Sequence, residues 1–181
     1  PNPDSPTGTI FSPDDLKKIV DAAGEVGALM LIDEAYHPLY QWTAVPWINE
    51  CKHLVVIRSF SKAWGAAGLR VGYALANEDL IMLIHKQRPM YEIGSIGCEY
   101  VKMMSRFPDT LAQSAHCLIE GKKMLELWLR NNEYIVPHAD GNFTLVEYNE
   151  ELAKVLDQVI VYKIVHIDKQ KFIRITSADK R

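Results

Sequence analysis

Lys62 lies in a loop whose neighbouring residues suit a phosphate group and a reactive amine. Ser59 and Ser61 flank it, Arg70 follows, and glycines stand at positions 65, 68 and 72. Serine hydroxyls and an arginine fork are good partners for a phosphate dianion, and glycines let the backbone approach a ligand closely. A lysine held partly out of water beside another cation is favoured as a nucleophile. Together these residues predict a loop that holds a phosphorylated aldehyde as an imine.

A second candidate residue, Asp33, ends the continuous apolar run Leu29–Ile32, which predicts a strand buried on both faces. In open parallel α/β sheets, ligands bind beyond the carboxyl ends of the strands. A buried carboxylate must be paired, act as a cap or take part in function, because an isolated buried charge is costly. Asp33 is therefore either a cap for the next turn or a functional acid. Tyr36, three residues later, would by itself be an aromatic residue of the core.

The lysine loop resembles the lysine motif of class I/II aminotransferases, the fold-type I enzymes that use pyridoxal 5'-phosphate (PLP). The spacing of residues 66–70, Ala-Ala-Gly-Leu-Arg, is most similar to the histidinol-phosphate aminotransferase branch. Three further motifs agree in order and spacing, so that the resemblance covers nearly the whole chain: Asn2–Gly8, Asp33–Tyr36 and Arg174–Thr176.

The resemblance implies catalytic roles for three residues. Lys62 would bind PLP covalently and then carry the proton between the substrate and the cofactor. Asp33 would pair with the pyridine nitrogen and keep it protonated, which makes the ring an electron sink. Tyr36 would donate a hydrogen bond to the 3'-oxygen of the cofactor.

The resemblance also assigns the cofactor phosphate to Ser59, Ser61 and Arg70. For each serine, capping of a turn is an equal competitor. Ser5 stands where the family usually has an asparagine that donates to the 3'-oxygen of PLP, and its shorter hydroxyl is a poorer fit. This departure affects the efficiency of transamination more than the binding of PLP.

The substrate end of the site is predicted from the last motif. Arg174 is the one charged residue in the strand pattern Phe172–Thr176, and such a residue usually lies on a solvated face. The resemblance instead makes Arg174 the clamp for the α-carboxylate of the substrate, through a two-pronged salt bridge. Asn142, followed by Phe143, resembles the Asn-Phe pair near that clamp.

The composition limits the classes of function. The chain has 181 residues, 48% of them hydrophobic and 24% charged, and a net charge of −3, which gives no basic field for nucleic acid. No apolar run reaches the length that spans a bilayer, so no membrane partner is expected. The histidines lack the spacing of metal ligands. The cysteines are scattered, odd in number and typical of reduced thiols in a cytoplasmic protein: Cys51, Cys98 and Cys117.

The elements follow from apolar periodicity, caps and breakers. They predict an α/β protein: part of the mostly parallel-sheet large PLP domain at 1–110 and a small α/β domain at 111–181. Residues 37–50 are expected to be a loop or short helix. The predicted helices are 13–26, 78–86, 95–105, 110–129 and 150–156. The predicted strands are 29–32, 54–58, 71–76, 134–136, 143–148, 159–165 and 171–176.

The function expected from the resemblance is PLP-dependent transfer of an amino group between an amino acid or amine and a 2-oxo acid. The expected enzyme serves amino-acid biosynthesis as a cytoplasmic homodimer, and the chain is expected to be its C-terminal half. A PLP-dependent decarboxylase of the threonine-phosphate type shares these motifs, and the bond that breaks depends on an orientation that the sequence does not show. A third alternative is a catalytically incomplete fragment or binding module of the same fold.

Overall fold

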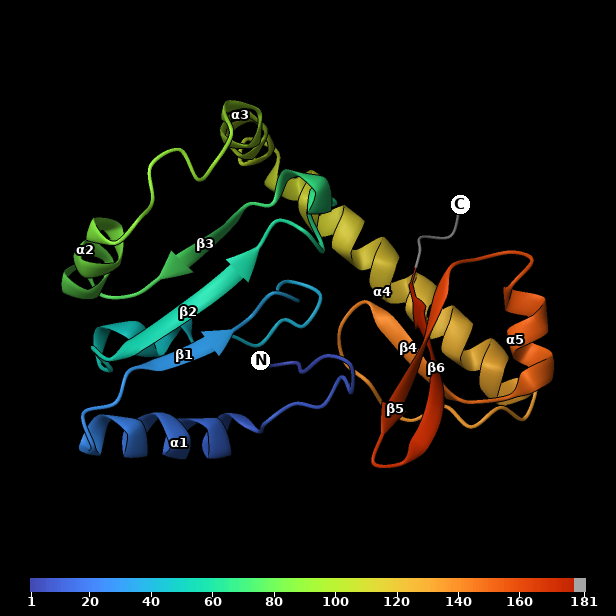
Figure 1. Ribbon diagram of the computed structural model, residues 1–181. Helices are drawn as coiled ribbons and strands as arrows, with labels where there is room; N and C mark the ends of the chain where they lie inside the picture. Colours follow the sequence, from blue (N-terminus) through green and yellow to red (C-terminus); the bar gives the residue numbers. More distant parts are fainter. Residues whose placement is uncertain (178–181) are drawn as a thin grey trace.

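The computed structural model describes residues 1–177 as two sheets joined by a long helix, α4 (Pro108–Asn131) (Figure 1). The elements before α4 are α1 (Pro13–Glu25), β1 (Met30–Asp33), η1 (Val45–Asn49), β2 (Leu54–Ser59), η2 (Ala67–Leu69), β3 (Gly72–Leu75), α2 (Glu78–Lys86) and α3 (Ser95–Met104). The elements after α4 are β4 (Phe143–Glu147), α5 (Glu150–Leu156), β5 (Tyr162–Ile167) and β6 (Gln170–Thr176).

The first sheet has the strand order β1-β2-β3, with β1 parallel to β2 and β3 antiparallel to β2. Met30 pairs with Leu54, and Ile32 pairs with Val56. The helices α1 and η1 pack against the face that bears these side chains, as expected for an apolar helix stripe on a sheet. Its buried core comprises Leu16, Val20, Ile32, Ala44, Ile48, Cys51, Leu54 and Val56.

The prediction that β1 is buried on both faces is wrong for this chain. Successive side chains of a strand point to opposite faces of the sheet. Ile32, which faces α1, is 2% exposed, whereas Leu31 is 52% exposed. The reason is that α1 and η1 pack on one face only, so the other face of β1 is open at Leu31.

Local capping explains why several helices lie where the sequence predicts them. Ser12 caps α1, because its hydroxyl oxygen accepts a hydrogen bond from the Asp15 amide at 3.1 Å. Asn77 caps α2 in the same way by accepting from the Leu80 amide at 3.1 Å. Gly27, just beyond α1, has a φ of +68°, a conformation that glycine adopts without steric cost.

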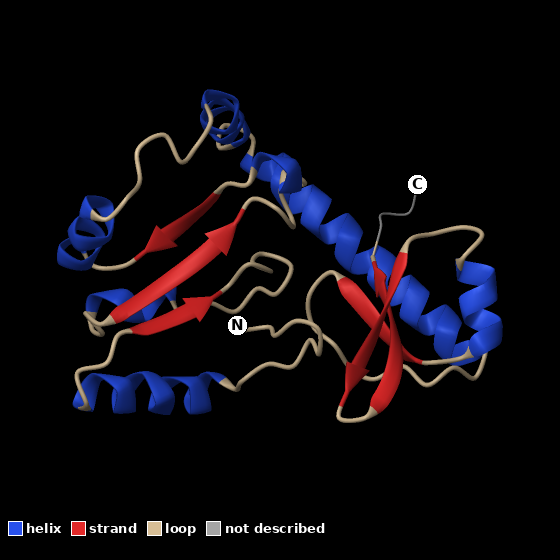
Figure 2. Ribbon diagram, viewed as in Figure 1, coloured by secondary structure: helices blue, strands red, loops and turns tan. Residues whose placement is uncertain are grey.

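The second sheet is antiparallel with the order β4-β6-β5, and α4 and α5 pack against one of its faces (Figure 2). Leu129 of α4 and Leu152 of α5 pack there against Val146 and Ile173. The alternate residues of β4 and β6, such as Phe143 and Phe172, point to the opposite face of this sheet and belong to a separate cluster. This second face packs against Tyr36, which lies in the turn after β1.

The predicted strand at 134–136 is absent. The carbonyl of Ile135 accepts a hydrogen bond from the Glu147 amide at 2.9 Å, but the residues are not in a strand. Pro137 follows directly and lacks the N–H that would extend a ladder. The predicted domain boundary at residue 110 stays a prediction, although α4 begins close to it, at Pro108. None of the helices formed by residues 1–177 has both the length and the apolar character needed to cross a bilayer.

Candidate active site

The carboxyl ends of β1 and β2 point toward the side of the molecule that carries the second sheet (Figure 1). The Lys62 Nζ atom lies 5.3 Å from the centroid of the Tyr36 ring. The Tyr36 hydroxyl oxygen accepts a hydrogen bond from Arg174 Nη2 at 3.4 Å. Three of the predicted site residues thus meet, although they come from the loop after β2, the turn after β1 and strand β6.

Tyr36 takes the core position that the sequence offered, and its role toward a cofactor stays a prediction. Its side chain is 5% exposed and belongs to a core cluster with Ala139, Phe143 and Leu145. The rings of Tyr36 and Phe143 meet edge to face, with centroids 5.8 Å apart. The ring is therefore a core aromatic, while its hydroxyl group is available to Arg174.

Arg174 contacts Tyr36 and Phe143 and is half-buried rather than on a solvated face. Its guanidinium carbon is 4.0 Å from the centroid of the Phe143 ring, which suits a cation–π contact. Its Nε atom is buried and has no hydrogen-bond partner among residues 1–177. A buried donor without an acceptor is costly, so this atom is suited to an incoming oxygen atom. Asn142 lies next to Phe143, and its carbonyl accepts from the Ser177 amide at 2.8 Å.

Because Gly141 has no side chain, the Tyr36 ring can pack directly against it. A Cβ atom at Gly141 would lie 3.1 Å from both Tyr36 Cδ1 and Phe143 Cε1, and the residue has a φ of +99°. We expect Gly141→Ala to lower the free energy of unfolding by roughly 2–4 kcal/mol, because backbone strain and overpacking both contribute. Urea unfolding of the chain measures this loss.

Gly27→Ala is the matched control for this substitution. Gly27 has a φ of +68°, and no atom of residues 1–177 lies within 4 Å of its added Cβ, so the substitution there adds backbone strain alone. The expected loss there is about 1 kcal/mol. Equal losses at the two positions would show that the Tyr36 ring does not rest on residue 141.

The opening motif also reaches the second half of the chain. The carbonyl of Gly8 accepts a hydrogen bond from the Asp140 amide at 2.8 Å. A Cβ at Gly8 would lie 2.5 Å from Ala139 Cβ, so the two backbones are in close contact. Lys122 of α4 donates to the carbonyl of Ala139 and, at 3.4 Å, to that of Gly141. These contacts hold the segment that packs against Tyr36.

Asp33 is the last residue of β1, where the sequence predicts it. Its Oδ1 atom accepts a hydrogen bond from the Ala35 amide at 2.9 Å, so the capping role is realised. Its backbone carbonyl accepts from the Asn2 amide at 2.9 Å, which places the opening motif beside it. Its role toward a cofactor stays a prediction.

The predicted phosphate-binding residues show turn contacts of their own. The Ser59 hydroxyl oxygen accepts a hydrogen bond from the Ser61 amide at 3.0 Å, which is the capping alternative. Arg70 has a φ of 54°, is exposed, and donates to the carbonyl of Ala67 at 3.3 Å. Ser59 pairs with Gly72, so Arg70 lies near the same end of the sheet.

Ser5 is exposed in the turn of the opening motif, where the Gly8 amide donates to the carbonyl of Asp4 at 3.0 Å. Within residues 1–177, no hydrogen bond joins it to Lys62 or Tyr36. The same described part of the chain contains no group of three or more histidine, cysteine, aspartate or glutamate side chains suited to a metal ion.

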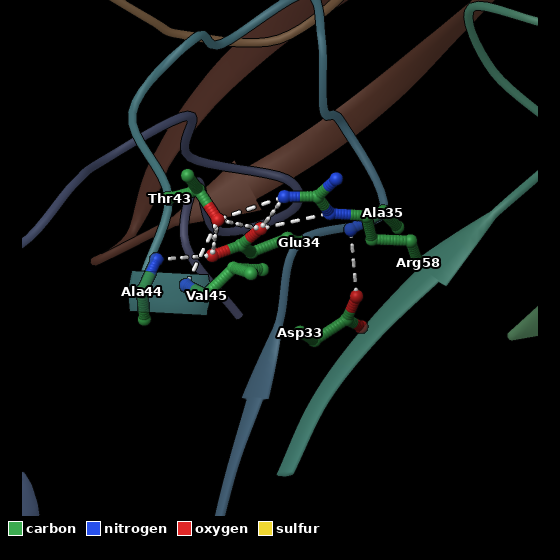
Figure 3. Close-up of polar contacts among 7 residues, drawn as sticks. All are labelled: Asp33, Glu34, Ala35, Thr43, Ala44, Val45 and Arg58. Atoms are coloured by element: carbon green, nitrogen blue, oxygen red, sulfur yellow. Dashed lines mark hydrogen bonds and ion pairs between the residues drawn. The ribbon is translucent and has the colours of Figure 1, made fainter. Parts of the chain in front are cut away.

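A buried polar cluster next to the site has no role in the sequence prediction. It consists of Glu34, Thr43, Ala44 and Arg58, and we name it the Glu34 network (Figure 3). Glu34 is 1% exposed and pairs with Arg58 at 2.9 Å. The signal was present in the sequence, because an acid directly after one apolar strand and an arginine near the end of the next are natural partners.

The Glu34 network acts on the nearby His37. Burial lowers the pKa of His37 below its ordinary value of 6.5, the positive charge of Arg58 lowers it further, and Glu34 opposes the shift. Because protonation is less favourable in the folded state, this contribution to stability is present above about pH 6.5 and is lost as the pH falls toward the lower folded pKa.

We therefore expect His37→Gln to flatten the pH dependence of stability. Between about pH 7 and pH 5, the melting temperature of the parent should fall more than that of the variant. Thermal unfolding followed by circular dichroism measures both. Parallel curves for the two proteins would show that His37 titrates alike in the folded and unfolded states.

Comparisons with known proteins place this chain among curated relatives. One curated relative, the histidinol-phosphate aminotransferase of Thermoanaerobacter sp. (strain X514), is 34% identical over 151 residues, which are 82% of this chain and 42% of the relative. The histidinol-phosphate aminotransferase of Thermotoga maritima is 27% identical over 97% of this chain and 52% of its own. The chain thus spans about half the length of the curated relatives it matches.

Solved structures share the fold. The structure of histidinol-phosphate aminotransferase from Sinorhizobium meliloti in complex with pyridoxal-5'-phosphate matches 99% of this chain and 52% of its own, at a TM-score of 0.79 and 20% identity. The L-threonine-O-3-phosphate decarboxylase of Porphyromonas gingivalis matches 99% of this chain and 58% of its own, at a TM-score of 0.78 and 19% identity. These likenesses confirm the predicted α/β class and the fold-type I arrangement.

The family comparison decides the relationship. The model of the aminotransferase class I and II family matches residues 1–180, which is nearly the whole chain. This match agrees with the resemblance carried by the lysine loop and the three further motifs. The chain belongs to the class I and II aminotransferase family.

Proposed function

We propose that the protein containing this chain is a PLP-dependent aminotransferase similar to histidinol-phosphate aminotransferases. The observation that carries the proposal is the meeting of Lys62, Tyr36 and Arg174 where the ends of β1 and β2 face the second sheet. The family match and the relatives named histidinol-phosphate aminotransferase support it. The substrates would be an amino acid or amine and a 2-oxo acid.

The residues present fit PLP by their chemistry. An amine suits an aldehyde, an acid at a strand end suits a pyridine nitrogen, and a half-buried arginine suits a carboxylate; the Nε atom of this arginine has no hydrogen-bond partner within residues 1–177. When bound, PLP supplies the carbonyl that takes up the amino group and the ring that withdraws electrons from the α-carbon. The residues that would hold it are Lys62, Asp33, Tyr36, Ser5, Ser59, Ser61 and Arg70.

Each of the central side chains would then have one task. The Lys62 amine would hold the cofactor and move the proton at the α-carbon of the substrate. Asp33 would keep a proton on the ring nitrogen. Tyr36 would orient the ring by a hydrogen bond from its hydroxyl group. Arg174, whose Nε is unpaired in residues 1–177, would bind the substrate carboxylate, with Asn142 beside it.

Decarboxylation is the second candidate function. The structural similarity to the threonine-phosphate decarboxylase of Porphyromonas gingivalis supports decarboxylation as an alternative. Both reactions need the same residues for the cofactor, and they differ in which bond at the α-carbon is aligned for cleavage. A catalytically incomplete binding module is the third.

One experiment separates the three candidates. The full-length protein is incubated with PLP and either histidinol phosphate plus 2-oxoglutarate or threonine O-3-phosphate. Glutamate formed from the first mixture supports the aminotransferase, and CO₂ released from the second supports the decarboxylase. Cofactor binding with neither product would favour the binding module.

We also propose that the protein is a cytoplasmic homodimer. Large apolar side chains are exposed on α2 and the segment that follows it, including Leu83, Met90 and Tyr91, and association would remove such surface from water. The unpaired state of the cysteines supports a reducing compartment. Light scattering of the full-length protein tests the dimer.

A further inference from the structure

The Glu34 network joins the ends of the two strands that lead into the candidate site. Glu34 directly follows Asp33, the last residue of β1, and Arg58 directly precedes Ser59, the last residue of β2. The Glu34 amide also donates to the carbonyl of Ile57 at 2.8 Å, so the two strand ends are joined by backbone and side chain alike.

The network leaves the buried carboxylate fully paired (Figure 3). Arg58 Nε and Nη2 reach Glu34 Oε2 at 3.0 and 2.9 Å. The Ala44 amide donates to Oε1 at 2.7 Å, and the Thr43 hydroxyl lies 3.0 and 2.8 Å from the two oxygens. Arg58 Nη2 also donates to Thr43 Oγ1 at 2.7 Å, which closes the ring of contacts. The side chains of Glu34 and Arg58 are 1% and 12% exposed.

Stability alone is a weak reason for such a network. A buried ion pair can often be replaced by packed apolar residues without loss of stability, because removing two charges from water is costly. What these contacts provide is orientation: two Arg58 donors converge on Oε2, while the Ala44 amide and the Thr43 hydroxyl hold Oε1, so that the direction of the carboxylate is fixed. Here the pair fixes the orientation of the segment with Asp33 and Tyr36 relative to the segment that leads to Lys62.

We propose that the Glu34 network positions Asp33, Tyr36 and Lys62 relative to one another. Glu34, Thr43 and Arg58 are thus positioning residues that act through the two strand ends without touching the substrate. The inference rests on the proposed function, because it concerns the geometry of the same site. A misplacement of about 1 Å can lower a catalytic rate by on the order of 10²-fold, so the network would matter strongly for turnover.

The main variant is Glu34→Gln in the full-length protein, which keeps the shape of the side chain and removes its charge. Val20→Ala is the control, because Val20 is 0% exposed in the core under the same sheet and is no member of the network. Both are compared well below their melting temperatures. We expect turnover to fall on the order of 10²-fold for Glu34→Gln and less than about 3-fold for Val20→Ala.

A second measurement needs no cofactor. The rate of Lys62 acetylation is followed by mass spectrometry over a pH series in the PLP-free protein, with the exposed Lys163 as internal reference. We expect the pH profile of Lys62 to shift in Glu34→Gln and to stay unchanged in Val20→Ala. A role in folding alone would shift neither profile.

Thr43→Val serves if Glu34→Gln does not fold, because it removes one hydroxyl and leaves the Glu34–Arg58 pair. We expect about a 10-fold loss of turnover and a smaller shift of the Lys62 profile. If both variants behave like Val20→Ala, the positioning role is overturned while the proposed function stands. If the parent protein fails to bind PLP, the proposed function falls, and the cofactor-free Lys62 profiles still decide the positioning role.

Discussion

Replacing Lys62 by alanine in the full-length protein is expected to lower turnover by at least about 10³-fold. In the proposed function this one side chain would be both the covalent anchor of PLP and the group that moves the proton, and proton transfer alone contributes about 10²–10⁴-fold. The visible absorbance of the parent protein with PLP should be lost in the variant. Borohydride reduction of the parent, followed by peptide mapping, should place the cofactor on Lys62.

Lys86→Ala is the matched control for this prediction. Lys86 is exposed in the last turn of α2, in the same half of the chain, and should be neutral. A label on Lys86 or another lysine, together with a coloured and active Lys62→Ala protein, would reject Lys62 as the anchor.

Replacing Asp33 by asparagine is expected to raise the catalytic barrier by about 3 kcal/mol, which is on the order of 10²-fold in rate. An asparagine oxygen can still accept the hydrogen bond that the Ala35 amide now gives to Asp33 Oδ1 at 2.9 Å. The turn should therefore keep its shape, while the neutral amide cannot hold a proton on the cofactor ring. Steady-state turnover and PLP affinity are measured together, and affinity should fall less than turnover.

Asp33→Ala separates the two roles of this residue. It removes both the charge and the cap, so it should lose about 1 kcal/mol of folding stability in addition to the rate. Thermal unfolding of the two variants measures the difference. An Asp33→Asn protein that turns over within a few-fold of the parent would mean that Asp33 is only a cap.

Helix positions were predictable because their causes are local. The helices at 78–86 and 150–156 lie where the sequence places them, since Asn77 and Asn149 each cap the amide three residues later. The strands of both sheets also follow from short apolar runs between breakers. The strand predicted at 134–136 failed because a strand needs a partner, and Pro137 withholds the donor that a ladder requires.

Burial was less predictable than the elements themselves. Leu31 and Ile32 are adjacent apolar residues of one strand, yet only Ile32 is buried. An apolar run indicates that a strand can be buried on both faces, but the elements that pack on each face decide whether its side chains are buried. Ile19 of α1, an apolar residue of the helix that packs on this sheet, is likewise 41% exposed.

The sequence by itself determined the family and most of the elements and pointed to the candidate residues, because motifs, caps and periodicity depend on near neighbours in the chain. Only the tertiary structure decided which of these residues meet. The contact of Tyr36 with Arg174 spans 138 positions, and the pairing of Glu34 with Arg58 spans 24. Such contacts depend on how two sheets and their helices pack, and a change of strand register or face would abolish them without altering any local pattern.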